Sequence, residues 1–227
     1  EATSGNTGIS LSAISASLGL KCVIFMPENM SEERREMMRI YGAQIVDAPV
    51  SDFQRAIEMR NEFIDQNENA WSPMQFSNPE NVKCHMTITG PEIAKQAGPA
   101  WAAFVHGSGT GGTIEGVRKF VKSENLPVKV LMVTPDEEMH GIQGIGDGQD
   151  FLASPDNVDG TISIATQEAI DRAKLFARET GILVGISAGA NILASERWVK
   201  ENDPLGIVVT MLCDRGERYM TIYNRKA

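Results

Sequence analysis

A glycine-rich run, Gly107-Ser108-Gly109-Thr110-Gly111-Gly112-Thr113, constrains this chain more than any other feature. The apolar stretch before it, 101–105, predicts a buried strand, and the stretch after it, 114–121, predicts a helix. Glycines let a backbone approach an anion closely, and the N–H groups and dipole of the helix start attract phosphate. The run has neither the Gly-Lys-Ser/Thr ending of a P-loop nor the wider spacing of a dinucleotide fingerprint. It therefore indicates a single phosphate on a small cofactor, with a plain structural turn as the alternative.

Two further loops have the same strand–loop–helix character. The segment Thr3-Ser4-Gly5-Asn6-Thr7-Gly8 offers hydroxyl, amide and backbone N–H groups that suit a carboxylate. The segment Gly185-Ile186-Ser187-Ala188-Gly189-Ala190 follows an apolar stretch and places one hydroxyl at its turn. Open α/β folds bind ligands at the carboxyl edge of a parallel sheet, where such loops gather. The three loops together predict a ligand crevice at a sheet edge.

Charge and cysteine usage exclude several classes of function. A formal net charge of −9 argues against nucleic acid or an anionic membrane as a main partner. The three cysteines, Cys22, Cys84 and Cys213, are an odd number without close spacing, which favours a reducing, cytoplasmic compartment. The three histidines share no ligand spacing, so we predict no metal site. Of these, His106 lies just before the glycine run, where it is either a ligand contact or a buried structural residue.

The order of the elements predicts an α/β protein with mostly parallel sheets. A loop over 71–79 with two prolines marks a domain boundary, so we expect a smaller domain at 1–78 and a larger one at 79–227. We predict helices at about 8–18, 32–41, 51–65, 82–97, 114–121, 166–180 and 188–200, and strands at 21–26, 44–47, 101–105, 128–133, 161–164, 182–184 and 207–212.

Across essentially its whole length the chain resembles the cysteine synthase family of pyridoxal-phosphate enzymes, which includes cystathionine β-synthase. The segments that carry the resemblance are Thr3-Ser4-Gly5-Asn6-Thr7-Gly8, Met26-Pro27-Glu28-Asn29-Met30-Ser31, Thr89-Gly90-Pro91-Glu92, Gly109-Thr110-Gly111-Gly112-Thr113, Gln143-Gly144-Ile145-Gly146 and Gly185-Ile186-Ser187-Ala188-Gly189. The resemblance implies a fold with two open, mostly parallel sheets flanked by helices, of which the smaller domain is incomplete here. The segment Cys213-Asp214-Arg215-Gly216 is similar to the B-type and carrier-protein-dependent branches.

The resemblance also implies roles for individual residues. Asn6 would bind the 3′ oxygen of pyridoxal 5′-phosphate, and Ser187 would face its pyridine nitrogen. A neutral hydroxyl does not hold that nitrogen protonated, which favours β-elimination over chemistry that needs a stronger electron sink. The phosphate would be held by Gly109, Thr110, Gly111, Gly112 and Thr113. The substrate carboxylate would be held by Thr3, Ser4, Gly5, Thr7 and Gln75.

One family feature has no counterpart in this sequence. The lysine that carries the cofactor in the family lies some tens of residues before the Thr-Ser-Gly-Asn loop, whereas here that loop begins at residue 3. The first lysine present, Lys21, falls in a predicted strand, so we assign no catalytic residue. Because the other site elements are mutually consistent, we expect the lysine in a preceding segment that this sequence does not include.

Three functions remain open on the sequence. The first is β-replacement on O-acetylserine through an α-aminoacrylate, with sulfide added to make cysteine. The second keeps the fold but changes the substrate, as in cystathionine β-synthase or a serine/threonine dehydratase-like lyase. The third is a lysine-less protein that binds without turnover. No arginine lies between Thr134 and Phe151, which argues against O-phosphoserine as donor. The resemblance further suggests a homodimer, with serine acetyltransferase or a sulfur-carrier protein as further candidate partners.

Overall fold

The computed structural model describes residues 1–3, 5–50, 52–98, 101–146 and 151–224. The chain forms two compact units, one of Glu1–Met74 together with Glu217–Ala227, the other of Gln75–Gly216. This division differs from the expected 1–78 and 79–227, chiefly because the C-terminal segment belongs with the first unit. Its hydrogen bonds explain the grouping: Thr221 donates through N and Oγ1 to Glu33, at 2.8 and 2.9 Å.

The first unit has a two-stranded parallel sheet, in which β1 pairs with β2 from Val23 opposite Gln44 onward. Ala2 forms an isolated parallel bridge to Phe25, so the N-terminal residues extend this sheet. Helix α3 contacts both strands, and α1 packs on α2. The elements of this unit are α1 (Asn6–Leu18), β1 (Val23–Pro27), α2 (Glu32–Ile40), β2 (Gln44–Ala48), α3 (Phe53–Asp65) and α9 (Met220–Tyr223), the last preceded by the 3₁₀ turn η4 (Gly216–Tyr219).

The second unit has a four-stranded sheet in the order β5-β4-β3-β6, with every pair parallel. Its central strands β3 and β4 read as continuous apolar runs, as strands buried on both faces do. The strands are β3 (Trp101–Gly107), β4 (Lys129–Pro135), β5 (Gly160–Ile164) and β6 (Ile207–Thr210).

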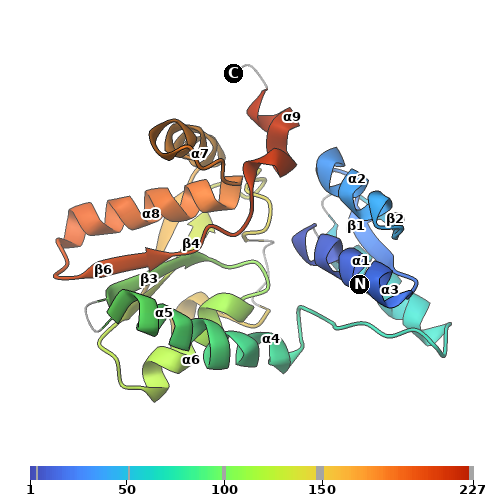
Figure 1. The fold of residues 1–227 in the computed structure, drawn as a ribbon, viewed down its shortest axis with the longest axis horizontal. Coiled ribbons are helices and arrows are strands. Elements are labelled where there is room, and N and C mark those ends of the chain that lie inside the picture. Colours follow the sequence, from blue (N-terminus) through green and yellow to red (C-terminus); the bar gives the residue numbers. More distant parts are fainter. Residues whose placement is uncertain (4, 51, 99–100, 147–150, 225–227) are drawn as a thin grey trace. The chain divides into compact units, whose positions relative to one another are not determined.

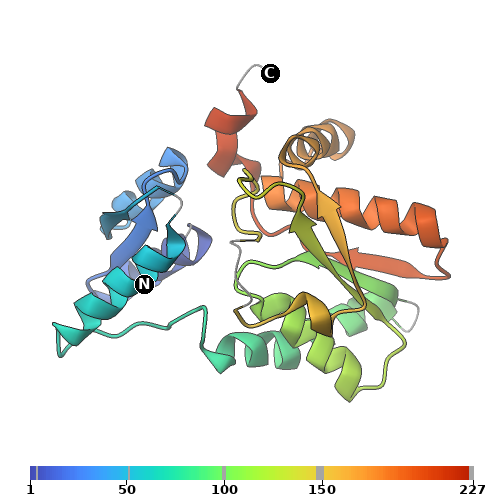
Figure 2. The ribbon, with the colours of Figure 1, turned by 180° about the vertical axis from the view of Figure 1, so that it is seen from behind.

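Helices cover both faces of this four-stranded sheet (Figure 1). Helices α7 and α8 lie on one face and α5 and α6 on the other, which is also visible from behind (Figure 2). The elements are α4 (Pro79–Cys84), the π-helical turn η1 (His85–Thr89), α5 (Gly90–Ala97), α6 (Gly112–Ser123), the 3₁₀ turn η3 (Pro155–Asn157), α7 (Thr166–Thr180) and α8 (Ile186–Asn202). The core on the α6 face is built from Phe104, Ile114, Val117 and Met132 and their neighbours.

Most expected elements are present, with two corrections. The helix expected at 82–97 is interrupted by the π turn η1, where α6 comes so close that a Cβ on Gly116 would lie 2.5 Å from His85 Cβ. The strand expected at 182–184 is wrong: Val184 forms only an isolated antiparallel bridge to Arg215. A short apolar run cannot by itself tell a strand from an extended connection. Within the described residues, none of the helices combines the length and apolar composition needed to cross a membrane.

Candidate functional site

The glycine run forms the turn between β3 and α6, as the sequence predicts. Gly111 precedes the helix with φ of 86°, a left-handed conformation that favours glycine, and Gly112 begins α6. The first N–H groups of a helix have no partner within the helix, so this end presents donors and a partial positive charge. Glu115 in the first turn would repel an anion, but Arg118 binds it through two hydrogen bonds of 2.7 and 2.9 Å. The start of α6 is therefore suited to a phosphate.

Two side chains from the preceding helical segment hold the hydroxyls of this loop. Asn81 donates to Thr110 Oγ1 at 3.1 Å and to the Gln75 carbonyl at 3.0 Å. The His85 ring lies with Nε2 3.2 Å from Thr113 Oγ1 and Nδ1 2.9 Å from Thr89 Oγ1. Partial burial lowers the pKa of His85, which keeps the ring neutral and able to accept one of these bonds.

Asn81 and His85 were not among the residues selected from the sequence. Their spacing of four residues, which places two side chains on one face of a helix, is the signal that could have found them.

The segment 142–146 packs directly on the glycine run. Gly146 N donates to the Ser108 carbonyl at 2.8 Å. A Cβ on Gly109 would lie 2.5 Å from the backbone oxygen of Gly144, and one on Gly107 would lie 2.1 Å from Ile145 Cδ1. Gly107 and Gly109 are thus required by the close approach of the 142–146 segment.

Ser187 lies in the first turn of α8 and is 4% exposed. Its hydroxyl lies close enough to the thiol of Cys213 to favour the ionised form of that thiol. Burial and the nearby Asp214 carboxylate raise the pKa of that thiol to about 11, although part of the residue is accessible to solvent. The thiol beside the Ser187 hydroxyl is therefore uncharged at neutral pH.

His106, at the end of β3, is a buried residue held within the protein. Its Nδ1 lies 3.2 Å from Asn191 Nδ2, and its ring packs against Phe104 at 5.6 Å between centroids. Burial lowers the pKa of His106 to about 4, so the ring is neutral near pH 7. Of the two roles left open by the sequence, these contacts favour the structural one.

The Thr3–Gly8 segment forms the entry to α1 in the first unit. Thr3 is buried, and its Oγ1 accepts from Gly5 N at 3.1 Å, which closes a short turn. Gly5 has φ of 152° and leads into α1, whose first residues are Asn6 and Thr7. A Cβ on Gly5 would lie 2.3 Å from Arg34 Cδ, so the loop rests on the Arg34 side chain. Ser4 lies outside the described residues.

Gln75 belongs to the second unit, at its first position. Its carbonyl accepts the Asn81 hydrogen bond, so its backbone is tied to the helical segment that also holds Thr110. The second unit thus contains Gln75, Ser187 and the glycine run 107–113, which we call the phosphate loop. The first unit contains Thr3, Gly5, Asn6 and Thr7.

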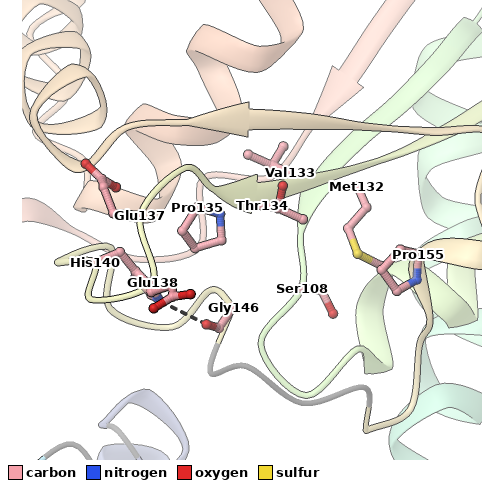
Figure 3. Close-up of a pocket in the computed structure, with 10 residues that line it drawn as sticks. All are labelled: Ser108, Met132, Val133, Thr134, Pro135, Glu137, Glu138, His140, Gly146 and Pro155. Carbon is pink, nitrogen blue, oxygen red and sulfur yellow. Dashed lines mark hydrogen bonds between the residues drawn. The ribbon is translucent and has the colours of Figure 1, made fainter.

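A cavity of about 420 Å³ opens beside the phosphate loop in the second unit (Figure 3). Its lining includes Ser108 and Gly146, from the two packed loops, and residues at the carboxyl end of β4. Two carboxylates, Glu137 and Glu138, are among the lining residues, and Arg and Lys are absent from the described lining. Glu137 also accepts from Thr166 N at the start of α7. The cavity therefore has acidic character.

Metal-binding groups do not gather in the part of the chain that the structure describes: no three His, Cys, Asp or Glu side chains come together there. A phosphate-bearing, neutral heteroaromatic cofactor suits the donor set better. The start of α6 offers N–H groups and threonine hydroxyls, and the buried Ser187 offers a neutral hydroxyl. The residues present fit pyridoxal phosphate.

Comparison with known proteins agrees with this geometry. The chain is 37% identical over 234 residues to a cysteine synthase of Staphylococcus aureus, across 97% of this chain and 75% of that protein. It is 38% identical to a cysteine synthase B of Campylobacter jejuni, across 97% and 77%.

Among solved structures, an O-acetylserine dependent cystathionine beta-synthase from Helicobacter pylori superposes with a TM-score of 0.91 at 29% identity, covering 97% of this chain and 75% of that one. The expected fold, with parallel sheets flanked by helices, is confirmed by this similarity. The model of the family described as "Pyridoxal-phosphate dependent enzyme" matches residues 1–214, so the chain belongs to that family, as the resemblance in its loops predicts.

Proposed function

We propose that the protein catalyses a pyridoxal-phosphate-dependent β-replacement in which O-acetylserine loses acetate and sulfide is added to give cysteine. The observation that carries the proposal is the phosphate-binding geometry at the start of α6, combined with the buried neutral hydroxyl of Ser187. The similarity to two cysteine synthases supports the choice of reaction.

The phosphate and the pyridine nitrogen of the cofactor would be held by residues of the second unit. Gly109, Gly111 and Gly112 bring the backbone close to the phosphate, while Thr110 and Thr113 offer hydroxyls whose orientation Asn81 and His85 restrain. Ser187 would face the pyridine nitrogen, and the family resemblance assigns the 3′ oxygen to Asn6. When bound, pyridoxal phosphate supplies an electron sink for breaking the bond between the substrate β-carbon and acetate.

The substrate carboxylate is assigned to the loop at the start of α1. The N–H groups at this helix end and the hydroxyls of Thr3 and Thr7 are the donors, with Ser4 and Gln75 as further members of the set. Gly5 is part of the set because its lack of a side chain lets the loop rest on Arg34. Holding the carboxylate orients the acetate-bearing carbon for reaction.

O-Acetylserine is favoured over O-phosphoserine as the donor. A phosphorylated substrate needs a cationic side chain near its leaving group, because the phosphate dianion must be neutralised on leaving water. The cavity beside the phosphate loop instead carries Glu137 and Glu138. Its charge disfavours a second phosphate.

The decisive experiment measures cysteine formed from O-acetylserine and sulfide by the purified full-length protein with added pyridoxal phosphate. We expect cysteine production that depends on all three. Replacing O-acetylserine with O-phosphoserine should lower kcat/KM by about tenfold or more. Release of pyruvate from serine instead would support a dehydratase, and cofactor binding without any turnover would support a binding protein.

Cystathionine synthesis from O-acetylserine and homocysteine is the second candidate, because the H. pylori enzyme superposes on 97% of the chain. The donor half of the reaction is the same and only the thiol differs. Competition between sulfide and homocysteine at equal concentration decides between them, since the product ratio reports the ratio of the two kcat/KM values. An excess of cystathionine would replace the first candidate with the second.

Assembly and location are further parts of the proposal. We assign the protein to the cytoplasm as a homodimer, with serine acetyltransferase or a sulfur-carrier protein as candidate partners. Sedimentation of the protein alone, and then with each candidate partner, tests the dimer and the two partners. A monomer at micromolar concentration would contradict the dimer.

A further inference from the structure

One fully buried amide, Asn191, joins two segments that the proposed function uses separately. The residue is 0% exposed and lies four positions after Ser187, on the same face of α8. Its Oδ1 accepts from Gly107 N at 2.9 Å, at the beginning of the phosphate loop. Its Nδ2 donates to the Met211 carbonyl at 3.0 Å, beyond the end of β6.

The chemistry of the partners settles which way this amide points. A backbone N–H is only a donor and a carbonyl is only an acceptor, so Oδ1 must face Gly107 and Nδ2 must face Met211. Nδ2 therefore also approaches His106 Nδ1 as a donor, at 3.2 Å. That nitrogen must be unprotonated, which agrees with the low pKa of the buried ring. The amide is thus satisfied on both sides in one orientation.

The same amide reaches the environment of the Ser187 hydroxyl. Asn191 Nδ2 lies 3.7 Å from the Cys213 thiol, and that thiol is near the Ser187 hydroxyl. A chain of contacts therefore runs from Gly107 through Asn191 and Cys213 to Ser187. A buried network of this kind holds its members in one geometry, because breaking any bond leaves a polar group without a partner.

We propose that Asn191 is a positioning residue that sets the separation between the phosphate loop and Ser187, and thereby the fit of the phosphate and the pyridine nitrogen of the cofactor at the same time. This inference rests on the proposed function, because it assigns those two segments to one cofactor. Asn191 is one helical turn away from Ser187 and acts through its neighbours. Substitution of Asn191 is therefore expected to lower cofactor affinity, and its effect should depend on whether Ser187 is present.

The test compares Asn191→Asp and Asn191→Ser with Asn202→Asp. Asn202 is a matched control because it lies at the exposed end of the same helix and donates only to the local Trp198 carbonyl. Dissociation constants are measured for pyridoxal phosphate and for pyridoxal, which lacks the phosphate. We expect both Asn191 variants to bind pyridoxal phosphate about tenfold or more weaker, with a smaller loss for pyridoxal, and Asn202→Asp to be unchanged.

Combining Asn191→Ser with Ser187→Ala separates positioning from simple loss of stability. If Asn191 acts by placing the loop relative to Ser187, the double variant should lose less affinity than the product of the two single losses. Independent, multiplicative losses would overturn the inference, as would folded Asn191 variants whose affinities stay within twofold of the parent. If Asn191→Asp does not fold, Asn191→Ser carries the test, since it removes the amide without placing a carboxylate beside His106.

The same binding constants distinguish failure of this inference from failure of the proposed function. If the parent protein does not bind pyridoxal phosphate, the proposed function fails and takes the inference with it. If the parent binds and the Asn191 variants bind equally well, the inference alone fails. NMR titration of the His106 ring in Asn191→Asp should show its pKa raised, because a carboxylate replaces the amide donor. An unchanged pKa of His106 in this variant would contradict the contact between Asn191 and His106.

Discussion

Two helices of this protein begin behind a glycine with positive φ and without a capping side chain, yet their loops are held in different ways. The loop before α6 is held by other segments: Asn81 and His85 bind its threonines, and residues 142–146 pack on its glycines. The loop before α1 contains the Thr3–Gly5 turn, is tied to β1 by a bond from Thr3 N to the Phe25 carbonyl at 3.1 Å, and rests on Arg34.

The difference matches what each loop is proposed to bind. A cofactor stays in place through many turnovers, so a loop fixed by tertiary contacts binds it without reorganisation. A substrate enters and leaves in every cycle, so the loop that binds it is expected to open and close. Comparing the two helix starts therefore gives expectations about which changes act on cofactor binding and which on substrate binding.

Gly109→Ala is the change with the largest expected effect. Its new Cβ would lie 2.5 Å from the Gly144 backbone oxygen, which cannot rotate away as a side chain could. The two loops must separate, so we expect cofactor affinity to fall about a hundredfold, or about 3 kcal/mol. Equilibrium dialysis with pyridoxal phosphate measures this loss. Gly160→Ala, whose Cβ would meet only the end of Leu131, is the control. Equal affinity in the two variants would contradict a rigid loop.

Acid is expected to destabilise the unit that holds the phosphate loop. The folded pKa of His106 is lowered from 6.5 to about 4, so the folded ring stays neutral in a range where the unfolded ring is protonated. The stability due to this residue is complete above pH 6.5, is lost as the pH falls toward 4, and then levels off. The loss is about 3 kcal/mol at most. The midpoints of urea unfolding between pH 7 and 4 measure this loss of stability. If His106→Asn loses as much stability over the same pH range, the loss does not come from the His106 ring.

Gly5→Ala should act on substrate binding and spare the cofactor. The new methyl would collide with the Arg34 side chain, in a backbone conformation that non-glycine residues rarely adopt. Because a flexible side chain can partly yield, we expect substrate binding to weaken by about 2 kcal/mol. The KM for O-acetylserine should then rise more than tenfold. Gly19→Ala also has positive φ, but its Cβ would enter open space, so it reports backbone strain alone. If Gly5→Ala lowers cofactor affinity as much as Gly109→Ala does, the two loops do not differ in what they bind.

Tyr219→Phe should have the smallest effect. Tyr219 OH accepts from Arg34 Nη2, and the Arg34 guanidinium lies 4.7 Å from the Tyr219 ring centroid. Phenylalanine keeps the ring contact and removes the acceptor, so we expect a loss of about 1 kcal/mol. The measurements are the thermal midpoint and the KM for O-acetylserine, which should rise a few-fold because Arg34 supports Gly5. Tyr223→Phe in the same segment is the control, and an equal rise in KM there would assign the effect to general loosening.

Local sequence patterns were enough to predict most of the elements and one of the loops in detail. Gly111 and Gly112 had to lie at a helix start, because an apolar strand precedes them and an amphipathic helix follows. The π turn at His85–Thr89, against which Gly116 of α6 packs closely, was not predicted in this way. The grouping of Glu217–Ala227 with the first unit depends on contacts to Glu33 and Arg34, more than 180 residues away in the chain.

The sequence by itself determined the family, the alternation of helices and strands, and the loops that carry the candidate site, because each of these is a local property of residue type and spacing. Only the tertiary structure decided which residues secure those loops. Asn81, His85 and Asn191 act through partners that lie 28 to 84 positions away in the chain, namely Thr113, Thr110 and Gly107. Hydrogen bonds between distant segments form only once the sheet and helices have packed, so their partners cannot be assigned from local pattern alone.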